Sequence, residues 1–293
     1  TASDPAYIKK LKEIIKNDKV NIIFGTVEKE VVELVAHKAQ LEALGAAVVL
    51  PETEVLQICF DKYKTQEFLK YNSDVSIPCI YSDDKKTIDT FIETHKLPII
   101  RKPVHGIGSK GLSIIKTPRD VGDIELDRNY VIQQYIEDEN VEKYYNTELN
   151  EYTAEVFVNN DKTIAGGIII KRALHGGETI AGHLVKDQTI IDTLAKIAYA
   201  LKIKGPCNFQ FRISDGRVRV FEINPLFSGT TAIRAGMGFN SVILAVKSFV
   251  QNNHQTVSQN ELKDTYFLRY FDEIFVDKDQ LETLRDEGVI YHG

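Results

Sequence analysis

The order of apolar and polar positions in the first sixty residues alternates between helical and strand-like spacing. Helical stripes run over 7–15 and 28–44, and short apolar runs lie at 20–24 and 46–50. Helices and strands that alternate at these lengths predict a parallel α/β sheet. Such a sheet normally opens with a strand, so we expect residues 1–60 to be the end of a larger α/β domain.

Beyond residue 61 the pattern changes from alternating helices and strands to paired strands. Period-2 runs bounded by turn residues become frequent after residue 151, which predicts antiparallel pairing. We predict three α+β lobes with boundaries at 1–60, 61–136 and 137–293. Helices are predicted over 62–71, 86–95, 188–201 and 239–250, and strands over 77–81, 98–102, 112–115, 130–134, 152–158, 163–171, 208–213 and 218–223.

Composition narrows the class of protein. The chain has 293 residues, 43% of them apolar and 27% charged, with a net charge of -6. No segment approaches the roughly 20 apolar residues of a membrane span, and the acidic balance argues against a nucleic-acid partner. Three scattered cysteines fit a reducing compartment better than a disulfide framework. We therefore expect a cytoplasmic protein that binds neither membrane nor nucleic acid.

A glycine-rich segment follows the predicted strand that ends at Lys102. Gly106, Gly108 and Gly111 have the GxGxxG spacing, but the chain continues as a strand rather than a helix, which argues against a dinucleotide-binding fold. Ser109-Lys110 has the reverse of the P-loop order. The segment therefore predicts a glycine hairpin whose backbone N–H groups can surround phosphate oxygens. A surface hairpin whose glycines only satisfy turn geometry fits these residues equally well.

The predicted hairpin around Asp215-Gly216 separates apolar from polar side chains. Alternation should send Phe209, Phe211, Phe221 and Ile223 to one face and Gln210, Glu222 and Asn224 to the other. Oxygen-bearing side chains on adjacent strands form a site for a hard cation, and their modest charge suits Mg²⁺ that already carries phosphate oxygens. An ordinary solvated sheet face is the competing interpretation.

Two further segments carry polar residues suited to a nucleotide. Gln133 and Gln134 end an apolar strand, as a segment bonding an adenine edge would, although a plain edge strand fits them as well. Residues 171–179 should form a loop with two cations, a histidine and two glycines. Cations beside a metal site suit a transferring phosphoryl group. The catalytic candidates are Lys171, Arg172, His175 and Arg234.

Together these segments resemble the ATP-grasp superfamily, and specifically the ATP-grasp halves of the carbamoyl phosphate synthetase large subunit. The segments that carry the resemblance are residues 59–62, 100–103 with the glycine loop, 175–179, 205–211 and 221–225. The resemblance spans about residues 4–250, and residues 4–60 are similar to the tail of a biotin-carboxylase-like domain. It implies a mixed α+β and α/β fold, ATP-grasp preceded by a partial pre-ATP-grasp α/β domain.

The resemblance also implies roles for single residues. It implies that ATP and Mg²⁺ or Mn²⁺ are bound. The nucleotide phosphates would contact Lys62 and Lys102, and a lid over them would include Gly106, Gly108, Ser109 and Gly111. The adenine would contact Gln133, Gln134 and Ile136, the ribose would contact Glu151, and the metal ligands would be Gln210, Glu222 and Asn224. The implied activity is an ADP-forming ligase that joins small-molecule carboxylates and amines through an acyl phosphate.

Three departures from the family pattern keep alternatives open. Leu226 replaces the usual Arg after Asn-Pro, residues 137–150 are an insertion, and the chain has one ATP-grasp unit where carbamoyl phosphate synthetase needs two. A split carbamoyl phosphate synthetase-like subunit and a nucleotide-binding module without turnover are the two alternatives to a ligase. A homodimer is compatible with each of them.

Overall fold

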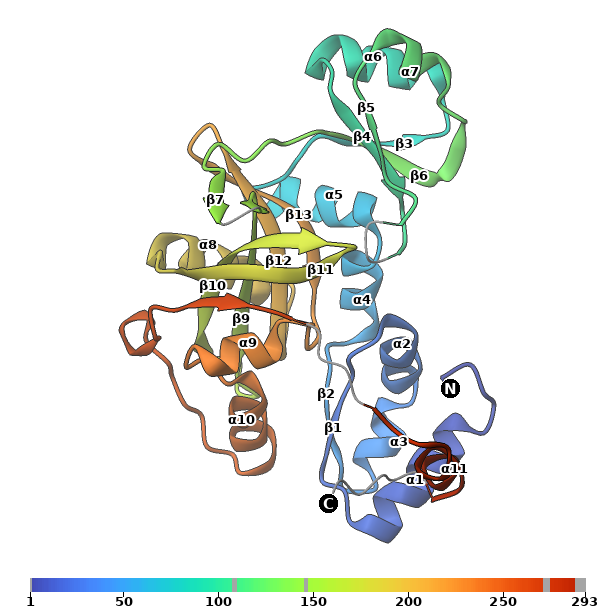
Figure 1. Cartoon of the computed structure of the whole chain (residues 1–293), viewed down its shortest axis with the longest axis vertical. Coiled ribbons are helices and arrows are strands. Elements are labelled where there is room, and N and C mark those ends of the chain that lie inside the picture. Colours follow the sequence, from blue (N-terminus) through green and yellow to red (C-terminus); the bar gives the residue numbers. More distant parts are fainter. Residues whose placement is uncertain (1, 107–109, 145–146, 271–274, 288–293) are drawn as a thin grey trace.

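The computed structural model describes residues 2–106, 110–144, 147–270 and 275–287. The elements form three groups (Figure 1). A small lobe of short helices and two strands lies at the bottom of the view, a four-stranded lobe lies at the top, and a large six-stranded sheet forms the third group.

The first lobe is the parallel α/β unit that the spacing predicts. Its strands pair in parallel register, with Ile22 opposite Ala47. The helix expected over 28–44 is broken at His37, whose ψ of 10° interrupts the helix while its ring bonds the Glu33 carbonyl. The elements are α1 (Tyr7–Asp18), β1 (Ile22–Phe24), α2 (Glu28–Ala36), α3 (Lys38–Glu42), β2 (Ala47–Val49) and α4 (Thr53–Cys59), the last not predicted.

The second lobe is an antiparallel sheet in the order β3-β6-β4-β5, with α6 packed against it. The helix α5 begins at the Asp61 cap, whose carboxylate accepts from the backbone of Tyr63 and Lys64, and packs on the third group instead. The elements are α5 (Lys62–Asn72), β3 (Cys79–Ser82), α6 (Lys85–His95), β4 (Ile99–Pro103), β5 (Ser113–Ile115), α7 (Pro118–Gly122) and β6 (Asp127–Gln134).

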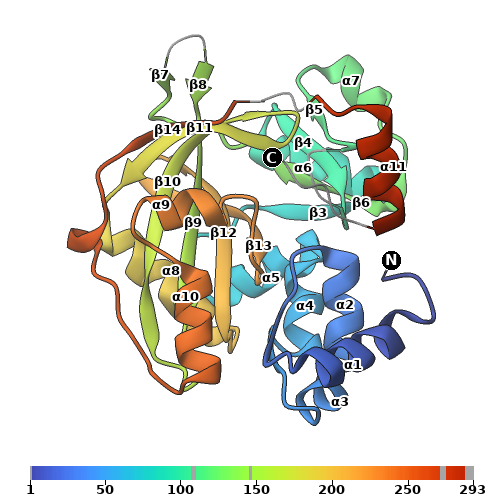
Figure 2. The same cartoon turned by 60° about the horizontal axis from the view of Figure 1, so that its bottom comes forward.

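The third group is a six-stranded antiparallel sheet in the order β13-β12-β9-β10-β11-β14. Figure 2 shows α9 and α10 in front of this sheet and α8 behind it. Its elements are β7 (Glu142–Tyr144), β8 (Thr147–Leu149), β9 (Glu151–Val158), β10 (Ile164–His175), β11 (Glu178–Val185), α8 (Gln188–Ala200), β12 (Gly205–Ser214), β13 (Arg217–Asn224), α9 (Thr231–Gly236), α10 (Ser241–Ala245), a π-helical turn (Val246–Val250), a 3₁₀ turn (Gln259–Glu261) and β14 (Tyr266–Leu268). The last helix, α11 (Lys278–Glu287), lies away from this sheet in Figures 1 and 2.

Two sequence predictions about this group were wrong. The loop expected over 171–179 is instead the tip of the β10–β11 hairpin, because Lys171 and Arg172 continue the β10 ladder. Only Gly176 and Gly177 make the turn, at φ of +57° and +85°. The helix expected over 239–250 is α10 followed by the π-helical turn.

Leu226 joins the large sheet to the first lobe. Its side chain is 9% exposed and lies in an apolar cluster with Val31, Leu50 and Leu56, which come from α2, the residue after β2 and α4. Leu226 also lines a cleft between the groups of elements. The Leu that departs from the family pattern therefore has a packing role between two lobes.

We expect Leu226→Ala to lower the free energy of unfolding by about 2 to 5 kcal/mol, because it removes buried methyl groups and leaves a cavity between the lobes. Leu226→Met keeps the volume and should cost less than about 1.5 kcal/mol. Urea titration followed by circular dichroism measures both variants. Equal midpoints for Leu226→Ala and the wild type would show that the lobes do not pack through this side chain.

Candidate functional site

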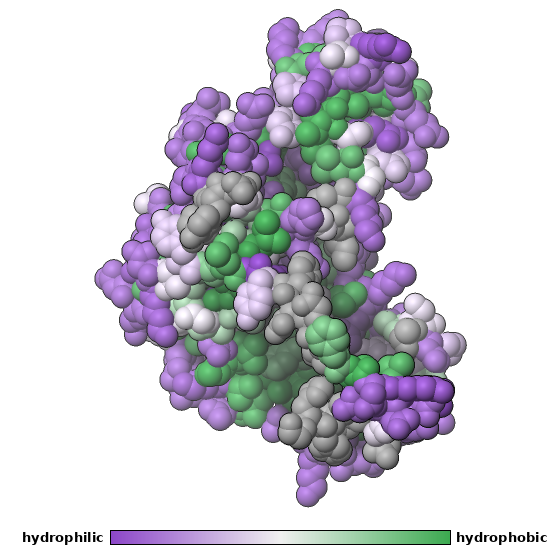
Figure 3. Space-filling view, in the orientation of Figure 1, coloured by the Kyte–Doolittle hydropathy of each residue, from purple (hydrophilic) through white to green (hydrophobic). Residues whose placement is uncertain are grey.

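A cleft of about 820 Å³ lies where the three groups of elements meet. Figure 3 shows the surface hollowed between the upper lobe and the rest of the molecule. Its walls come from the first turn of α2, from β4 and β6, from the tip of the β10–β11 hairpin, and from β12, β13 and the segment 226–230. Residues that are distant in the sequence therefore share this cleft.

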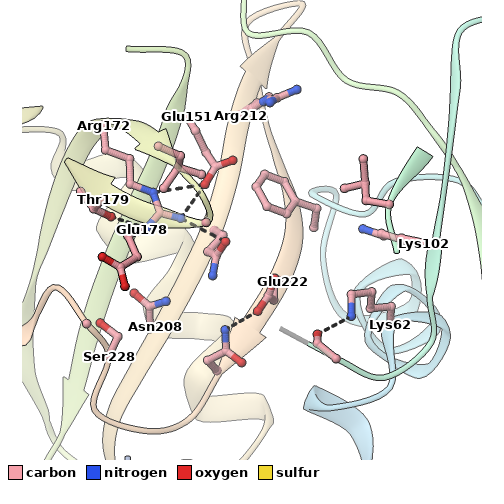
Figure 4. A pocket seen from close by; sticks show the side chains of 18 of the residues that line it. Lys62, Lys102, Glu151, Arg172, Glu178, Thr179, Asn208, Arg212, Glu222 and Ser228 are labelled. Atoms are coloured by element: carbon pink, nitrogen blue, oxygen red, sulfur yellow. Dashed lines mark hydrogen bonds and ion pairs between the residues drawn. The ribbon is translucent and has the colours of Figure 1, made fainter. Parts of the chain in front are cut away.

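Two lysines form one side of the cleft (Figure 4). Lys102 on β4 is only 6% exposed, and its Nζ lies 5.8 Å from the centre of the Phe221 ring. Lys62, in the first turn of α5, donates from Nζ to the Gly106 carbonyl at 3.0 Å. Both side chains and Gly106 line the cleft. The structure thus brings together the two lysines and the start of the glycine loop.

The glycine loop is only partly described. Gly106 has a φ of +126° and Gly111 a φ of +73°, values that a side chain would strain. A Cβ on Gly111 would also lie 3.0 Å from the Pro103 ring. Gly108 and Ser109 lie outside the described residues. Within the described part, Gly106 and Lys110 line the cleft and Gly111 does not.

Burial changes the acidity of Lys102. The pKa of Lys102 is lowered to about 8, mainly because the ammonium is removed from water. The neighbouring Lys62 acts in the same direction, and Cys79, Glu222 and Glu151 act in the opposite one. No described carboxylate forms an ion pair with the Lys102 ammonium within 4 Å. A buried cation without a partner is a favourable place for a phosphate group.

The predicted adenine residues lie along one edge of the cleft. Gln133, Gln134 and Ile136 all line it. Gln133 is 2% exposed, and its amide nitrogen is buried without a hydrogen-bond partner among the described residues. The Ile136 carbonyl accepts from Arg212 at 2.6 Å. A ligand with an acceptor atom at this edge would satisfy the Gln133 amide.

The polar face of the β12–β13 hairpin opens into the cleft. Gln210 lies opposite Glu222, and all three predicted metal ligands line the cleft. Phe221 is an exception to the predicted alternation, because the register shifts between Gln210 and Phe211 and leaves Phe221 in a β-bulge. Its side chain lines the cleft, and Val220 takes the expected place in the core.

The oxygens on this face fit a hard cation. The Asn224 amide nitrogen donates to Glu222 Oε1 at 2.7 Å, which leaves Asn224 Oδ1 and Glu222 Oε2 for a ligand. Gln210 Oε1 already accepts from Arg172 at 3.1 Å and has one lone pair left. A single carboxylate with two amide oxygens suits a cation whose other ligands are phosphate oxygens. Among described residues, no group of three His, Cys, Asp or Glu side chains is placed to hold a metal.

Arg172 alone of the four predicted catalytic residues lines the cleft. It donates to Glu151 Oε1 at 2.5 Å, to Thr179 and to Gln210. Glu151, the predicted ribose ligand, also lines the cleft, and one of its carboxylate oxygens forms an ion pair with Arg172. The Arg172 guanidinium is held at the edge of the polar face rather than extended into the open cleft.

The other three candidates lie away from the cleft lining. Lys171 is fully buried and pairs with Glu142 at 3.1 Å and Asp138 at 3.6 Å. His175 is exposed at the end of β10. Arg234 is fully buried and pairs with Glu155 at 2.7 Å. Adjacent residues of a strand point to opposite faces, so alternation would have placed Lys171 and Arg172 on different sides. It was not applied to them because the segment was predicted to be a loop.

Several residues at the far side of the cleft were given no role from the sequence, although segments 175–179 and 205–211 carry the resemblance. Glu178 and Thr179 at the hairpin tip, Asn208 on β12 and Ser228 line the cleft (Figure 4), as does Arg269. Asn208 is two positions before Gln210 and shares its face, so the alternation that found Gln210 could have found it. Arg269 donates to the Gly229 carbonyl at 2.8 Å across 40 positions, which no local pattern indicates.

Comparison with known proteins confirms the resemblance to the ATP-grasp superfamily. A family model described as "ATP-grasp in the biosynthetic pathway with Ter operon" matches residues 146–271. The chain is 24% identical over 243 residues to the carbamoyl phosphate synthase large chain of Thermoplasma acidophilum, and 25% identical over 251 residues to that of Methanoculleus marisnigri. These matches cover 78% and 79% of this chain but only 23% of each relative, so the chain spans about a quarter of their length.

Solved structures show that the fold is the ATP-grasp fold. The N5-carboxyaminoimidazole synthetase of Staphylococcus aureus complexed with ADP matches with a TM-score of 0.67 and 19% identity, covering 92% of this chain and 67% of that one. Biotin carboxylase of Campylobacter jejuni matches with a TM-score of 0.68 and 13% identity, covering 90% and 62%. Within the described residues, no helix has the length and apolar character needed to span a membrane.

The lowered pKa of Lys102 predicts that nucleotide affinity depends on pH. Bound phosphate favours the ammonium form, so affinity should be greatest below pH 8 and fall as the pH rises through about 8. At pH 8, binding should take up about half a proton. Calorimetry of Mg-ADP binding in buffers of different ionisation enthalpy measures both effects.

Lys102→Met is the matched variant, because it keeps the stem and removes the charge. We expect its affinity to be about ten- to a hundredfold weaker at pH 7, as the loss of one charged hydrogen bond implies, with no proton uptake near pH 8. The same pH profile in the variant and the wild type would assign the titration to another group.

Proposed function

We propose that the protein is an ATP- and Mg²⁺-dependent carboxylate ligase that forms ADP through an acyl-phosphate intermediate. The observation that carries the proposal is the arrangement of charge across one cleft. Lys62 and Lys102 lie across from Glu222 in Figure 4, and Gln210 and Asn224 line the same cleft. Such an opposition can hold a polyphosphate between ammonium groups on one side and a cation site on the other.

The position of the polar groups suggests how a nucleotide would lie. Its base would bond the edge formed by Gln133, Gln134 and Ile136, and its phosphates would run toward the lysines. Glu151 keeps one oxygen free for a ribose hydroxyl, because only its Oε1 accepts from Arg172. When bound at Glu222, Asn224 and Gln210, Mg²⁺ would neutralise charge on the phosphate oxygens.

The acceptor would enter from the side of Arg172, Glu178 and Ser228. A carboxylate oxygen attacks the γ-phosphorus, the bond to the β–γ bridging oxygen breaks, and ADP leaves. The amine nitrogen then attacks the acyl carbon and inorganic phosphate leaves, with the amine proton released to solvent. The chain supplies orientation and fixed positive charge for these steps rather than a general base.

Two alternatives have support of their own. The similarity to the carbamoyl phosphate synthase large chain supports a split subunit of that type, with bicarbonate as acceptor. The apolar environment of Leu226, where the family pattern has an arginine, supports a nucleotide-binding module without turnover. The boundaries 1–60, 61–136 and 137–293, and the assignment of the first lobe to a partial pre-ATP-grasp domain, belong to this proposal as well.

An acceptor screen separates the three possibilities. Purified protein with Mg-ATP is incubated with pairs of small carboxylates and amines, and ADP is measured by a coupled assay. ADP formation that requires both members of a pair is expected for the ligase. Stimulation by bicarbonate alone would favour the carbamoyl phosphate synthetase-like subunit, and nucleotide binding without ADP formation for every pair would favour the binding module.

We expect Glu222→Ala to abolish Mg²⁺-dependent ADP formation and to leave the fold intact. The carboxylate faces the cleft rather than the core, so its removal should change the free energy of unfolding by less than about 0.5 kcal/mol. Turnover is measured over a range of Mg²⁺ concentrations, and thermal unfolding serves as the control for folding. Wild-type turnover in the folded variant would overturn the metal assignment.

A further inference from the structure

A buried arginine lies beside the polar face of the cleft, on the same side of the large sheet. Arg234 on α9 is fully buried, and one of its terminal nitrogens donates to Glu155 Oε2 at 2.7 Å and to Ser228 Oγ at 3.1 Å. The other donates to Thr153 Oγ1 at 2.8 Å and to Asn208 Oδ1 at 2.5 Å. Its guanidinium therefore bridges β9, β12 and the segment that follows β13.

These contacts leave one orientation for the Asn208 side chain. An arginine has only donors, so the atom that receives its hydrogen bond must be the amide oxygen. Thr153 Oγ1 accepts from Arg234 and donates to the same Asn208 Oδ1 at 2.8 Å. The amide nitrogen of Asn208 is left with no hydrogen bond to a described residue, in a side chain that is 3% exposed and lines the cleft.

The register places that nitrogen beside the proposed metal ligands. Asn208 lies directly opposite Asn224 and on the same face as Gln210. Figure 4 shows Asn208 beside Glu178 and Ser228, on the opposite side of Glu222 from the two lysines. A fixed N–H donor at this point can bond an oxygen of the acceptor or of the phosphoryl group at the moment of transfer.

We propose that Arg234 is a positioning residue, which holds the Asn208 amide so that its N–H donors face the oxygen undergoing phosphoryl transfer. The sequence placed Arg234 among the catalytic candidates, but its burial keeps it away from any substrate. It acts through Asn208, and its hydrogen bond to Ser228 helps to hold the guanidinium in place. The role in turnover rests on the proposed function, whereas the control of amide orientation does not.

The test combines two substitutions. Arg234→Lys keeps the charge beside Glu155 but cannot reach all four acceptors from one ammonium. Asn208→Asp keeps the oxygen that faces the network and removes the donors that face the cleft. We expect each to lower kcat on the order of 100-fold, the loss seen when one preorganised donor is removed, with the affinity for Mg-ADP within about threefold of wild type.

Non-additivity distinguishes positioning from a general structural role. If Arg234 acts through Asn208, the double variant should have the kcat of Asn208→Asp alone, within about threefold. Multiplied losses, or a weakened Mg-ADP affinity in Arg234→Lys with unchanged kcat, would overturn the proposal. Arg219→Lys is the control, because Arg219 bonds the carbonyls of Asp74 and Ser76 outside the cleft lining and should keep wild-type turnover.

A second readout does not require turnover. In protein labelled with ¹⁵N at asparagine, the Asn208 side-chain amide signal is identified by its loss in Asn208→Asp. It should shift or broaden in Arg234→Lys and stay in place in Arg219→Lys. An unmoved signal in Arg234→Lys overturns the proposal. If the wild type forms no ADP with any acceptor pair, the proposed ligase function fails, and this spectrum decides the positioning role alone.

Should Arg234→Lys not fold, Thr153→Val removes one donor to the same Asn208 oxygen and keeps the shape of the side chain. We expect it to lower kcat by a smaller factor, with Mg-ADP affinity unchanged and the Asn208 signal shifted. Unchanged kcat together with an unmoved signal would overturn the proposal.

Discussion

The site depends on the antiparallel pairing of β12 with β13. This register places Asn208 opposite Asn224 and Gln210 opposite Glu222, so that all four polar side chains open into one cleft. A shift of one residue would turn them toward the apolar cluster that holds Phe209 and Ile223. The burial of Phe209 and Ile223 therefore sets the strand register, and the register sets which side chains face the cleft.

The two buried arginines of the third group are paired from one strand. Glu151 and Glu155 stand on the same face of β9 and hold Arg172 and Arg234. Such pairs contribute little net stability, but loss of one partner typically costs about 3 to 5 kcal/mol because the other charge stays buried. Their effect is to hold two guanidinium groups at fixed places, one in the cleft and one beside it. Lys102 differs, since no described carboxylate pairs with it.

The cleft also depends on how the lobes are joined. Leu226 follows the last polar residues of β13 and enters the apolar cluster of the first lobe. The segment 137–144 is held to β10 by fully buried Lys171, which pairs with Asp138 and Glu142. Further along the chain, Thr147, Glu148 and Asn150 line the cleft. Apolar contact and buried charge therefore both join segments around the cleft.

Short-range patterns in the sequence determined most of the secondary structure and the polar face of the hairpin. Period-2 alternation identified Gln210, Glu222 and Asn224 because strand geometry is local, and it failed at Phe221 because a bulge depends on how two strands pair. Likewise, residues 171–179 read as a loop because glycines and charges dominate the segment. Their pairing with β9 and β11 made most of it strand.

Tertiary structure alone decided which charges face the cleft. The sequence grouped Lys171, Arg172, His175 and Arg234 by chemistry. The folded chain places Lys171 and Arg172 on opposite faces of a sheet, His175 at the end of a hairpin, and Arg234 at a buried position on α9. Burial, the register across strands and contacts between residues as far apart as Thr153 and Arg234 set that division. These interactions join segments that are distant in the chain, so no local pattern of residue types contains them.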